Sequence, residues 1–380
     1  MESIWDRANP QLRDLAVYQP GKPMEETARE LGCEPSEIIK LASNENPLGP
    51  SPKAIEAMRD AIENAHLYPD GGAFYLRNAI AQKLNVTPDH ILLGNGSNEI
   101  IELLAHAFLE RGDAIVTSEH AFVAYKIIAR VFGAQTIEAP SRDYGHDLDA
   151  ILDAITARSE LIFIVNPNNP TGTLLSADAI EHFMMRVPPT VVVVFDEAYY
   201  EFVDRMPDTL RYVRDGRNVV TLRTFSKIHG LASLRVGYGI APPELIEVMH
   251  KTRQPFNVSG VGQVAALAAL ADEEHQRETK RLVDEGRAFF EKEFRAMKLS
   301  FVPSAANFVL VKVGDGLAVF RALLQRKVIV RAMKGYNLAE WIRITIGTME
   351  QNRKCVSALR QVTRLVAQAS CPPTAPRTPT

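Results

Sequence analysis

Short runs of apolar, mostly β-branched residues alternate with helical patterns from about Leu92 to Ile240. The run Val191-Val192-Val193-Val194-Phe195 contains no polar residue, which is typical of a central strand buried on both faces. Between the runs, apolar residues recur at helical spacing, as in 98–109. This alternation predicts an α/β fold with a mostly parallel sheet sandwiched by helices. The predicted strands lie at 114–117, 136–138, 161–165, 191–195, 219–222 and 235–240.

A second pattern of the same kind follows after about Phe256. A long helical stretch at 264–297 precedes further apolar runs, which predicts a smaller α/β domain. The first 43 residues are irregular and rich in Pro and polar residues, and the last eleven are rich in Pro and Thr. We therefore predict an N-terminal arm packing with the small domain (1–43), a large domain (44–255), a small domain (256–369) and a disordered tail (370–380).

Composition narrows the class of function. The 380 residues carry a formal charge of -3 and no basic run, so neither nucleic acid nor a membrane is expected as a partner. No apolar run approaches the roughly 18 residues that a spanning helix needs. Three widely separated cysteines, Cys33, Cys355 and Cys371, have no metal or redox spacing. We expect a cytoplasmic enzyme acting on a small molecule, with no metal site.

Reactive side chains follow the predicted strands. Lys227, in Arg223-Thr224-Phe225-Ser226-Lys227, could form a Schiff base, although an isolated lysine is usually a solvated charge. Asp196 ends the most apolar strand, where it could hold a protonated pyridine nitrogen or simply cap a helix. Asn169 could hydrogen-bond a ring oxygen or simply belong to a rigid turn. Tyr199 could donate to the same oxygen or be an ordinary half-buried tyrosine. Phe122 could stack on a ring or belong to the core.

A glycine-rich loop precedes the helical pattern at 98–109, with the sequence Gly94-Asn95-Gly96-Ser97-Asn98-Glu99. Amides at a helix N-terminus bind anions, and Ser226 and Arg235 could join them on a phosphate. The loop could instead be a plain glycine-rich turn or the fingerprint of a dinucleotide-binding site. The fingerprint is disfavoured because Glu99 stands in place of its third glycine. The sequence also lacks metal-binding histidine spacing, a Gly-x-Ser-x-Gly elbow and a Walker loop.

These parts together resemble the fold-type I pyridoxal-phosphate aminotransferases, and most of all the histidinol-phosphate aminotransferases. The resemblance covers nearly the whole chain apart from the tail. Further matching motifs are Tyr18-Gln19-Pro20-Gly21-Lys22-Pro23, Ser43-Asn44-Glu45-Asn46-Pro47-Leu48-Gly49, Tyr68-Pro69-Asp70-Gly71, Gly230-Leu231-Ala232-Ser233-Leu234-Arg235 and Arg343-Ile344-Thr345-Ile346-Gly347-Thr348.

The resemblance implies a role for each matching residue. Lys227 is the catalytic Schiff-base lysine, Asp196 faces the pyridinium nitrogen, and Phe122 stacks on the ring. The residues implied to bind the ring oxygen are Asn169 and Tyr199, and those implied to bind the phosphate are Ser97, Asn98, Thr224, Ser226 and Arg235. The family is dimeric with shared active sites, so Tyr68 would reach the phosphate of the neighbouring subunit. The implied substrate-binding residues are Tyr18, Asn46, Arg331 and Arg343.

Two positions depart from the family pattern: Phe122 stands where relatives often carry tyrosine, and Ser233 where glycine is common. Neither departure removes a reacting group.

The implied reaction is transamination of histidinol phosphate with 2-oxoglutarate, giving imidazole acetol phosphate and glutamate in histidine biosynthesis. An arginine fork pairs equally well with a phosphate or a carboxylate, so an aromatic amino acid is the alternative donor. A phospho-amino-acid decarboxylase of the same fold and a non-catalytic ligand-binding relative are further alternatives.

Overall fold

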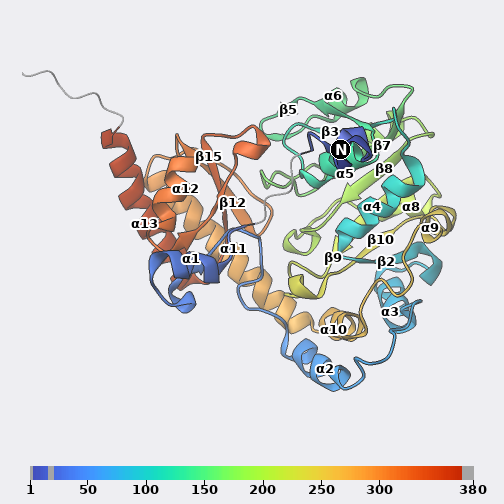
Figure 1. Ribbon diagram of the computed structural model, residues 1–380, viewed down its shortest axis with the longest axis horizontal. Helices are drawn as coiled ribbons and strands as arrows, with labels where there is room; N and C mark the ends of the chain where they lie inside the picture. The colour runs from blue at the N-terminus through green and yellow to red at the C-terminus, as the bar shows by residue number, and fades with distance from the viewer. Residues whose placement is uncertain (1–2, 16–20, 370–380) are drawn as a thin grey trace, which may run out of the picture.

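The computed structural model describes residues 3–15 and 21–369, with side chains described as far as 363. Tyr18 and the predicted tail at 370–380 lie outside these residues. Two sheets carry the fold, each covered by helices (Figure 1). Within the described part of the chain, no helix is both long and apolar enough to cross a membrane.

The larger sheet has seven strands and confirms the predicted mostly parallel arrangement. Strand β10 runs antiparallel to both of its neighbours, and the others from β9 to β4 are parallel. Each of the six predicted runs coincides with a strand to within one or two residues at either end, whereas β2 was not predicted. In spatial order the strands are β2 (Ile91–Asn95), β10 (Val236–Ile240), β9 (Val219–Thr224), β8 (Val192–Asp196), β7 (Ser159–Val165), β3 (Ala114–Ser118) and β4 (Gln135–Ala139).

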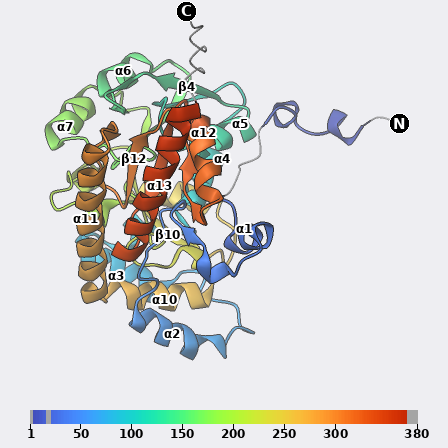
Figure 2. The same cartoon turned by 90° about the vertical axis from the view of Figure 1, so that its left-hand side faces the viewer.

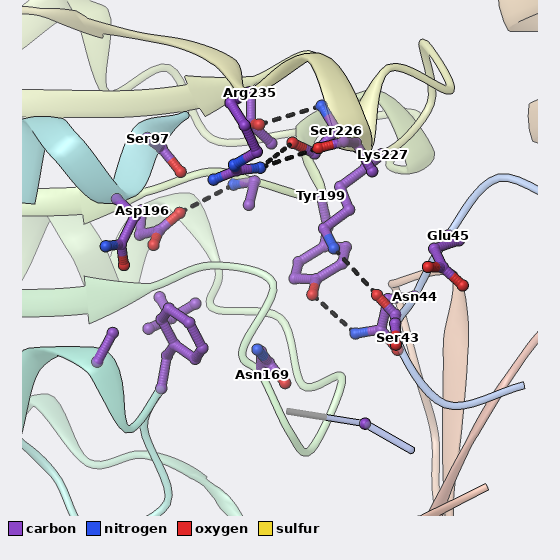
Figure 3. Close-up of a pocket in the computed structure, with 18 of the residues that line it drawn as sticks. Ser43, Asn44, Glu45, Ser97, Asn169, Asp196, Tyr199, Ser226, Lys227 and Arg235 are labelled. Atoms are coloured by element: carbon purple, nitrogen blue, oxygen red, sulfur yellow. Dashed lines mark hydrogen bonds between the residues drawn. The ribbon is translucent and has the colours of Figure 1, made fainter. Parts of the chain in front are cut away.

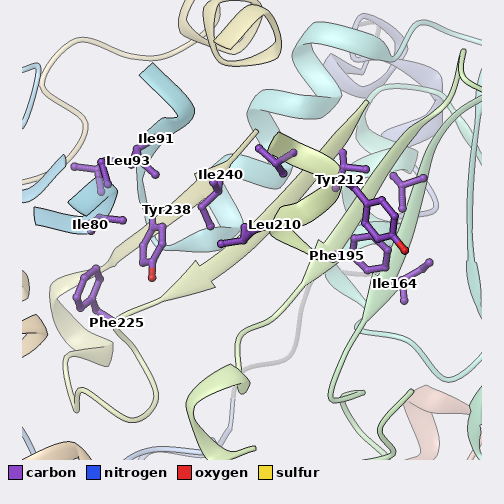
Figure 4. Close-up of a cluster of buried hydrophobic side chains, with 14 of the residues drawn as sticks. Ile80, Ile91, Leu93, Ile164, Phe195, Leu210, Tyr212, Phe225, Tyr238 and Ile240 are labelled. Carbon is purple, nitrogen blue, oxygen red and sulfur yellow. The ribbon is translucent and has the colours of Figure 1, made fainter. Parts of the chain in front are cut away.

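Both faces of this sheet are buried, as the apolar run in β8 predicts. Val193 and Phe195 belong to the core on one face, while Val192 and Val194 belong to the core on the other. Such alternation follows from the two-residue period of a strand. Figure 4 shows part of the first core, around Phe195. It is covered by α3 (Phe74–Leu84), α6 (Leu148–Asp153), α7 (Ala177–Arg186), α8 (Leu210–Arg214) and α10 (Gly260–Leu270), and the second by α4 (Ser97–Phe108), α5 (Ala124–Val131) and α9 (Pro243–His250).

The smaller sheet and its helices form what we call the C-terminal unit. Its four strands are, in order, β11 (Phe301–Val302), β12 (Phe308–Lys312), β15 (Trp341–Thr345) and β14 (Arg331–Ala332). Figure 2 shows its helices beside this sheet: α11 (Glu273–Ala296), α12 (Gly316–Leu324) and α13 (Met349–Ala369). Their contact is apolar, with Phe290, Leu323 and Leu359 fully buried.

The predicted helical stretch at 264–297 is in fact two helices. Helix α10 ends at Leu270, and α11 begins at Glu273 after Asp272 at its N-cap. Propensity does not mark the break between them, because the Ala-rich α10 and the amphipathic α11 are both strong helix formers.

The arm is more regular than its composition predicts. It contains α1 (Met24–Leu31), whose only buried residues are Thr27 and Ala28, so its apolar stripe was too narrow to recognise. Strand β1 (Ile39–Lys40) pairs in parallel with β13 (Val328–Ile329). The part of the arm from α1 to Ala42 therefore lies on the C-terminal unit. Its first part does not, which corrects the prediction for the whole arm: Gln11 hydrogen-bonds the Val131 carbonyl oxygen at the end of α5 (Ala124–Val131). Helix α2 (Pro52–Ile62), beyond the arm, packs on α10.

Candidate active site

A cavity of about 750 Å³ lies where β7, β8 and β9 reach their carboxyl ends and meet the C-terminal unit (Figure 3). Open α/β sheets bind ligands in a crevice at this edge. Twelve of the predicted site residues line it: Ser97, Asn98, Phe122, Asn169, Asp196, Tyr199, Thr224, Ser226, Lys227, Arg235, Arg331 and Arg343.

Asp196, the last residue of β8, is anchored through both carboxylate oxygens. Oδ1 accepts a hydrogen bond from the Ala198 backbone N–H at 3.1 Å, and Oδ2 accepts one from the Tyr125 hydroxyl at 2.6 Å. The side chain is almost fully buried, which raises the pKa of the carboxyl group. A carboxylate in this position is stabilised by a cation placed against it.

Tyr125, in α5, is a site residue that the sequence analysis missed. Its ring stacks on Phe163 with centroids 4.4 Å apart and planes 8° apart. Burial, followed by the charge of Asp196, raises the pKa of its hydroxyl well above the usual value, so the phenol stays a donor. Phe122 lies just before α5 rather than in it, and its ring packs edge-on against Tyr125 with centroids 5.7 Å apart.

Lys227 follows β9, and its amine enters the cavity. Nζ lies 3.4 Å from the Ser43 carbonyl oxygen and 5.7 Å from the centroid of the Tyr199 ring. Burial, and next the charge of Arg343, lower the pKa of the amine to about 8. A larger fraction of this lysine is therefore neutral, and hence nucleophilic, than of an exposed lysine at the same pH.

Two groups on the neighbouring loops are held in fixed orientations. The Tyr199 hydroxyl accepts a hydrogen bond from Asn44 Nδ2 at 2.8 Å, and burial raises its pKa to about 12. Asn169, in the loop after β7, accepts a hydrogen bond at Oδ1 from Arg343 Nη1 at 2.5 Å. This contact identifies the Oδ1 end of the amide and leaves its N–H groups as possible donors to a ligand.

An anion cradle occupies the end of the cavity at the start of α4. Gly96 precedes this helix with a φ of 78°, and a Cβ placed there would lie 2.3 Å from Arg235 Nη2. The guanidinium group of Arg235 is also 3.4 Å from Ser226 Oγ. A helix N-terminus, a hydroxyl and a guanidinium group thus converge, as phosphate binding requires. Thr224 Oγ1 supports the turn by accepting from the Ser226 N–H at 3.1 Å.

Two arginines form the opposite wall. Arg331 in β14 and Arg343 in β15 are directly paired across antiparallel strands, so their side chains leave the same face of the sheet. Like charges in this arrangement repel, and an anion between them relieves the repulsion. Arg343 is also held by the Ala42 carbonyl oxygen, 2.8 Å from Nη2.

Three predicted residues are not in this cavity. Tyr68 is 83% exposed and stacks on Phe256, with centroids 4.8 Å apart. The Asn46 amide donates to the Ile228 carbonyl oxygen at 2.7 Å and to Thr279 Oγ1 at 3.1 Å. Asn46 therefore holds the loop after Lys227 in place and does not line the cavity. Tyr18 lies outside the described residues.

The residues present fit pyridoxal phosphate. The cradle at Gly96 suits its phosphate, the buried Asp196 suits a protonated pyridine nitrogen, and Lys227 offers an amine of lowered pKa to its aldehyde. Within residues 3–15 and 21–369, no cluster of His, Cys, Asp and Glu could hold a metal ion.

Comparison with known proteins agrees with this arrangement. The model of the family described as aminotransferase class I and II matches residues 36–359. The chain therefore belongs to this family. It is similar to the histidinol-phosphate aminotransferase of Akkermansia muciniphila, with 54% identity over 361 residues that cover 95% of this chain and 99% of the relative. The histidinol-phosphate aminotransferase of Moorella thermoacetica is 47% identical over 355 residues, which cover 92% of each chain.

Solved structures share the fold. The histidinol-phosphate aminotransferase of Sinorhizobium meliloti in complex with pyridoxal-5′-phosphate superposes with a TM-score of 0.87 at 28% identity, covering 95% of this chain and 98% of the other. A double mutant of Thermus thermophilus aspartate aminotransferase superposes with a TM-score of 0.79 at 21% identity, covering 93% and 99%. These likenesses confirm the predicted fold type I.

Proposed function

We propose that this protein transfers the amino group of histidinol phosphate to 2-oxoglutarate, giving imidazole acetol phosphate and glutamate, with pyridoxal phosphate as cofactor. The observation that carries this proposal is the 54% identity, over nearly the whole of both chains, to a histidinol-phosphate aminotransferase. The structure supports it with a cavity that combines a lysine of lowered pKa, a phosphate cradle and a pair of arginines.

The wall formed by the seven-stranded sheet would hold the cofactor. Asp196 would keep the proton of the pyridine nitrogen in place, and Phe122 would cover the ring face. Asn169 and Tyr199 would donate to the ring oxygen. The residues that would hold the phosphate are Ser97, Asn98, Ser226 and Arg235, with Thr224 supporting the turn. When bound, pyridoxal phosphate supplies an electron-withdrawing ring that acidifies the substrate carbon bearing the amino group.

Lys227 would move the proton. Its neutral Nζ can accept a proton from the substrate carbon that bears the amino group, and the resulting ammonium group can return it to a neighbouring carbon. The lowered pKa of about 8 favours the neutral form needed for the first transfer. Tyr199 keeps its own proton throughout, because burial raises its pKa to about 12.

Arg331 and Arg343 would bind the anionic end of the substrate. Histidinol phosphate has no α-carboxylate, so its phosphate would take this place, and 2-oxoglutarate would use a carboxylate there in the second half-reaction. Both anions accept paired N–H donors from guanidinium groups. Tyr18 would bind the same end of the substrate.

Two copies of the chain would complete the site. The segment from Ile62 to Tyr75 exposes an unusual density of large apolar side chains, and Phe256 stacks on one of them. Apolar surface of this extent marks an interaction site, and a homodimer with Tyr68 reaching the partner's phosphate cradle would bury it. The exposed members of this surface are Ile62, Leu67, Tyr68, Phe74, Tyr75 and Phe256.

We also retain the division into an arm (1–43), a large domain (44–255) and a small domain (256–369), which is in keeping with two separate sheets. The described cysteines, Cys33 and Cys355, are unpaired, in keeping with work in the reducing cytoplasm.

Side-by-side kcat/KM values test the choice of substrate. With 2-oxoglutarate as acceptor, histidinol phosphate is expected to give a higher kcat/KM than phenylalanine, in keeping with the similarity to histidinol-phosphate aminotransferases. A preference for phenylalanine would replace the proposal with an aromatic aminotransferase. Carbon dioxide release without glutamate formation would replace it with a decarboxylase.

A further inference from the structure

Asn44 has an unusual conformation at the junction between the arm and the seven-stranded sheet. Its φ is 56°, in the left-handed region, and its side chain is 1% exposed. Residues other than glycine avoid this region, although asparagine tolerates it better than most. A buried residue in such a conformation is kept there by its surroundings.

Each polar group of Asn44 has a hydrogen-bond partner. Its backbone N–H donates to Thr345 Oγ1 at 2.9 Å, and its carbonyl oxygen accepts from Asn307 Nδ2 at 3.0 Å. Its Oδ1 accepts from Thr345 Oγ1 at 3.1 Å, and its Nδ2 donates to the Tyr199 hydroxyl at 2.8 Å (Figure 3). Thr345 ends β15 and Asn307 directly precedes β12, so the C-terminal unit fixes three of these four groups.

These contacts define where the Tyr199 hydroxyl points. The phenol oxygen already accepts the amide N–H of Asn44, so its own hydrogen is directed elsewhere. The ring cannot turn freely, because it packs edge-on against Phe308 with centroids 5.3 Å apart. Since Tyr199 lines the cavity, the hydroxyl is available as a donor to a ligand there.

We propose that Asn44 is a positioning residue that orients the Tyr199 hydroxyl toward the ring oxygen of the cofactor and ties it to the C-terminal unit through Thr345 and Asn307. This inference rests on the proposed function, in which Tyr199 donates to that oxygen. The amide N–H of Asn44 polarises the phenol that accepts it, so the Tyr199 hydroxyl becomes a stronger donor to the ring oxygen. Loss of the amide weakens that donation while the phenol itself stays in place.

The substitution Asn44→Gly isolates the side chain, because glycine adopts a positive φ at no steric cost. The visible absorbance of the bound cofactor is titrated with pH in the wild-type protein and in the variant. We expect the midpoint of this titration to rise by about 0.5–1 pH unit in the variant. A ring oxygen that is less stabilised as an anion holds more tightly the proton that it shares with the nitrogen joining the cofactor to Lys227. We also expect kcat to fall about 3- to 10-fold, with cofactor content unchanged.

The double variant Asn44→Gly/Tyr199→Phe separates positioning from a general structural effect. Without the phenol there is nothing for Asn44 to orient, so the double variant is expected to have the same midpoint as Tyr199→Phe. Asn85→Gly is the matched control: Asn85 ends α3 in the same left-handed conformation, is exposed, and lies outside the cavity lining. Its midpoint is expected to equal that of the wild type.

Two results would overturn the inference. One is an unchanged midpoint in Asn44→Gly with cofactor bound. The other is a shift caused by Asn44→Gly that is as large in the Tyr199→Phe background as in the wild type. If Asn44→Gly fails to bind cofactor, Thr345→Val gives the same test, because it removes both hydrogen bonds of the hydroxyl to Asn44. A wild-type protein that binds no pyridoxal phosphate would instead contradict the proposed function.

Discussion

The two walls of the cavity differ in the charges that they present. On the wall of the seven-stranded sheet, polar groups are already anchored, as in Asp196, whose two oxygens accept from Ala198 and Tyr125. On the wall of the C-terminal unit, Arg331 and Arg343 are paired directly across two strands, which brings two like charges to one face, and Arg343 is itself held by Asn169 and Ala42. The first wall suits a group that stays bound. The second suits anions that come and go, because each arriving anion relieves the repulsion.

The largest effect is expected from the lysine on the first wall. Lys227→Ala removes the amine that accepts the substrate proton, so amino transfer is expected to fall by at least about 10⁴-fold. Circular dichroism checks that the fold is kept. Lys251→Ala, whose side chain is 74% exposed, is the control and is expected to keep full activity. Unchanged turnover in Lys227→Ala would remove Lys227 from the mechanism.

A pair of arginine variants sharpens the contrast between the walls. Arg331→Gln is expected to lower kcat/KM for histidinol phosphate by about 10- to 100-fold, the value of one charge-assisted hydrogen bond, with cofactor affinity unchanged. Arg235→Gln is expected to weaken cofactor affinity by a similar factor. Cofactor affinity is measured by absorbance titration of the apoenzyme. If both variants weakened cofactor affinity, or both lowered only kcat/KM for the substrate, the two walls would not have separate functions.

The cost of burying Lys227 is expected to appear in the stability of the apoenzyme. Its native pKa of about 8 lies below the usual 10.5, so the unfolded chain binds the proton more tightly. The penalty is complete below about pH 8 and disappears as the pH rises to about 10.5. Apo Lys227→Met is therefore expected to be about 1–3 kcal/mol more stable than the apo wild type at pH 7, with a smaller difference at pH 10. Denaturant unfolding at both pH values measures this, and a difference that grows with pH would show that the sign is wrong.

The smallest effect is expected at the second anchor of Asp196. Tyr125→Phe removes one hydrogen bond to Oδ2 while the Ala198 N–H remains, so cofactor affinity is expected to fall about 3- to 10-fold. Tyr144→Phe is the control, because the Tyr144 side chain is on the surface and outside the cavity lining. An effect of more than about 100-fold would mean that Tyr125 itself touches the reacting groups.

The strands and the motifs that follow them could be predicted because both signals are local. Asn169 and Lys227 lie in the loops that directly follow β7 and β9, and Asp196 is the last residue of β8. Parallel strands bring their carboxyl ends to one edge, so the grouping of these residues follows from the fold class.

The supporting contacts could not be predicted in the same way. Tyr125 reaches Asp196 from 71 positions away, and Asn44 reaches Tyr199 from 155 positions away. Such contacts depend on how separate elements pack, and neither residue type is distinctive by itself. The contacts of Asn46 have the same origin, because its partners, Ile228 and Thr279, come from distant loop and helix positions.

Mapping the cofactor's attachment site tests the central claim most directly. The purified protein is incubated with pyridoxal phosphate, reduced with borohydride, digested and analysed by mass spectrometry. The account predicts a single phosphopyridoxyl group, on Nζ of Lys227. Its absence, or its presence mainly on another lysine, would contradict the account.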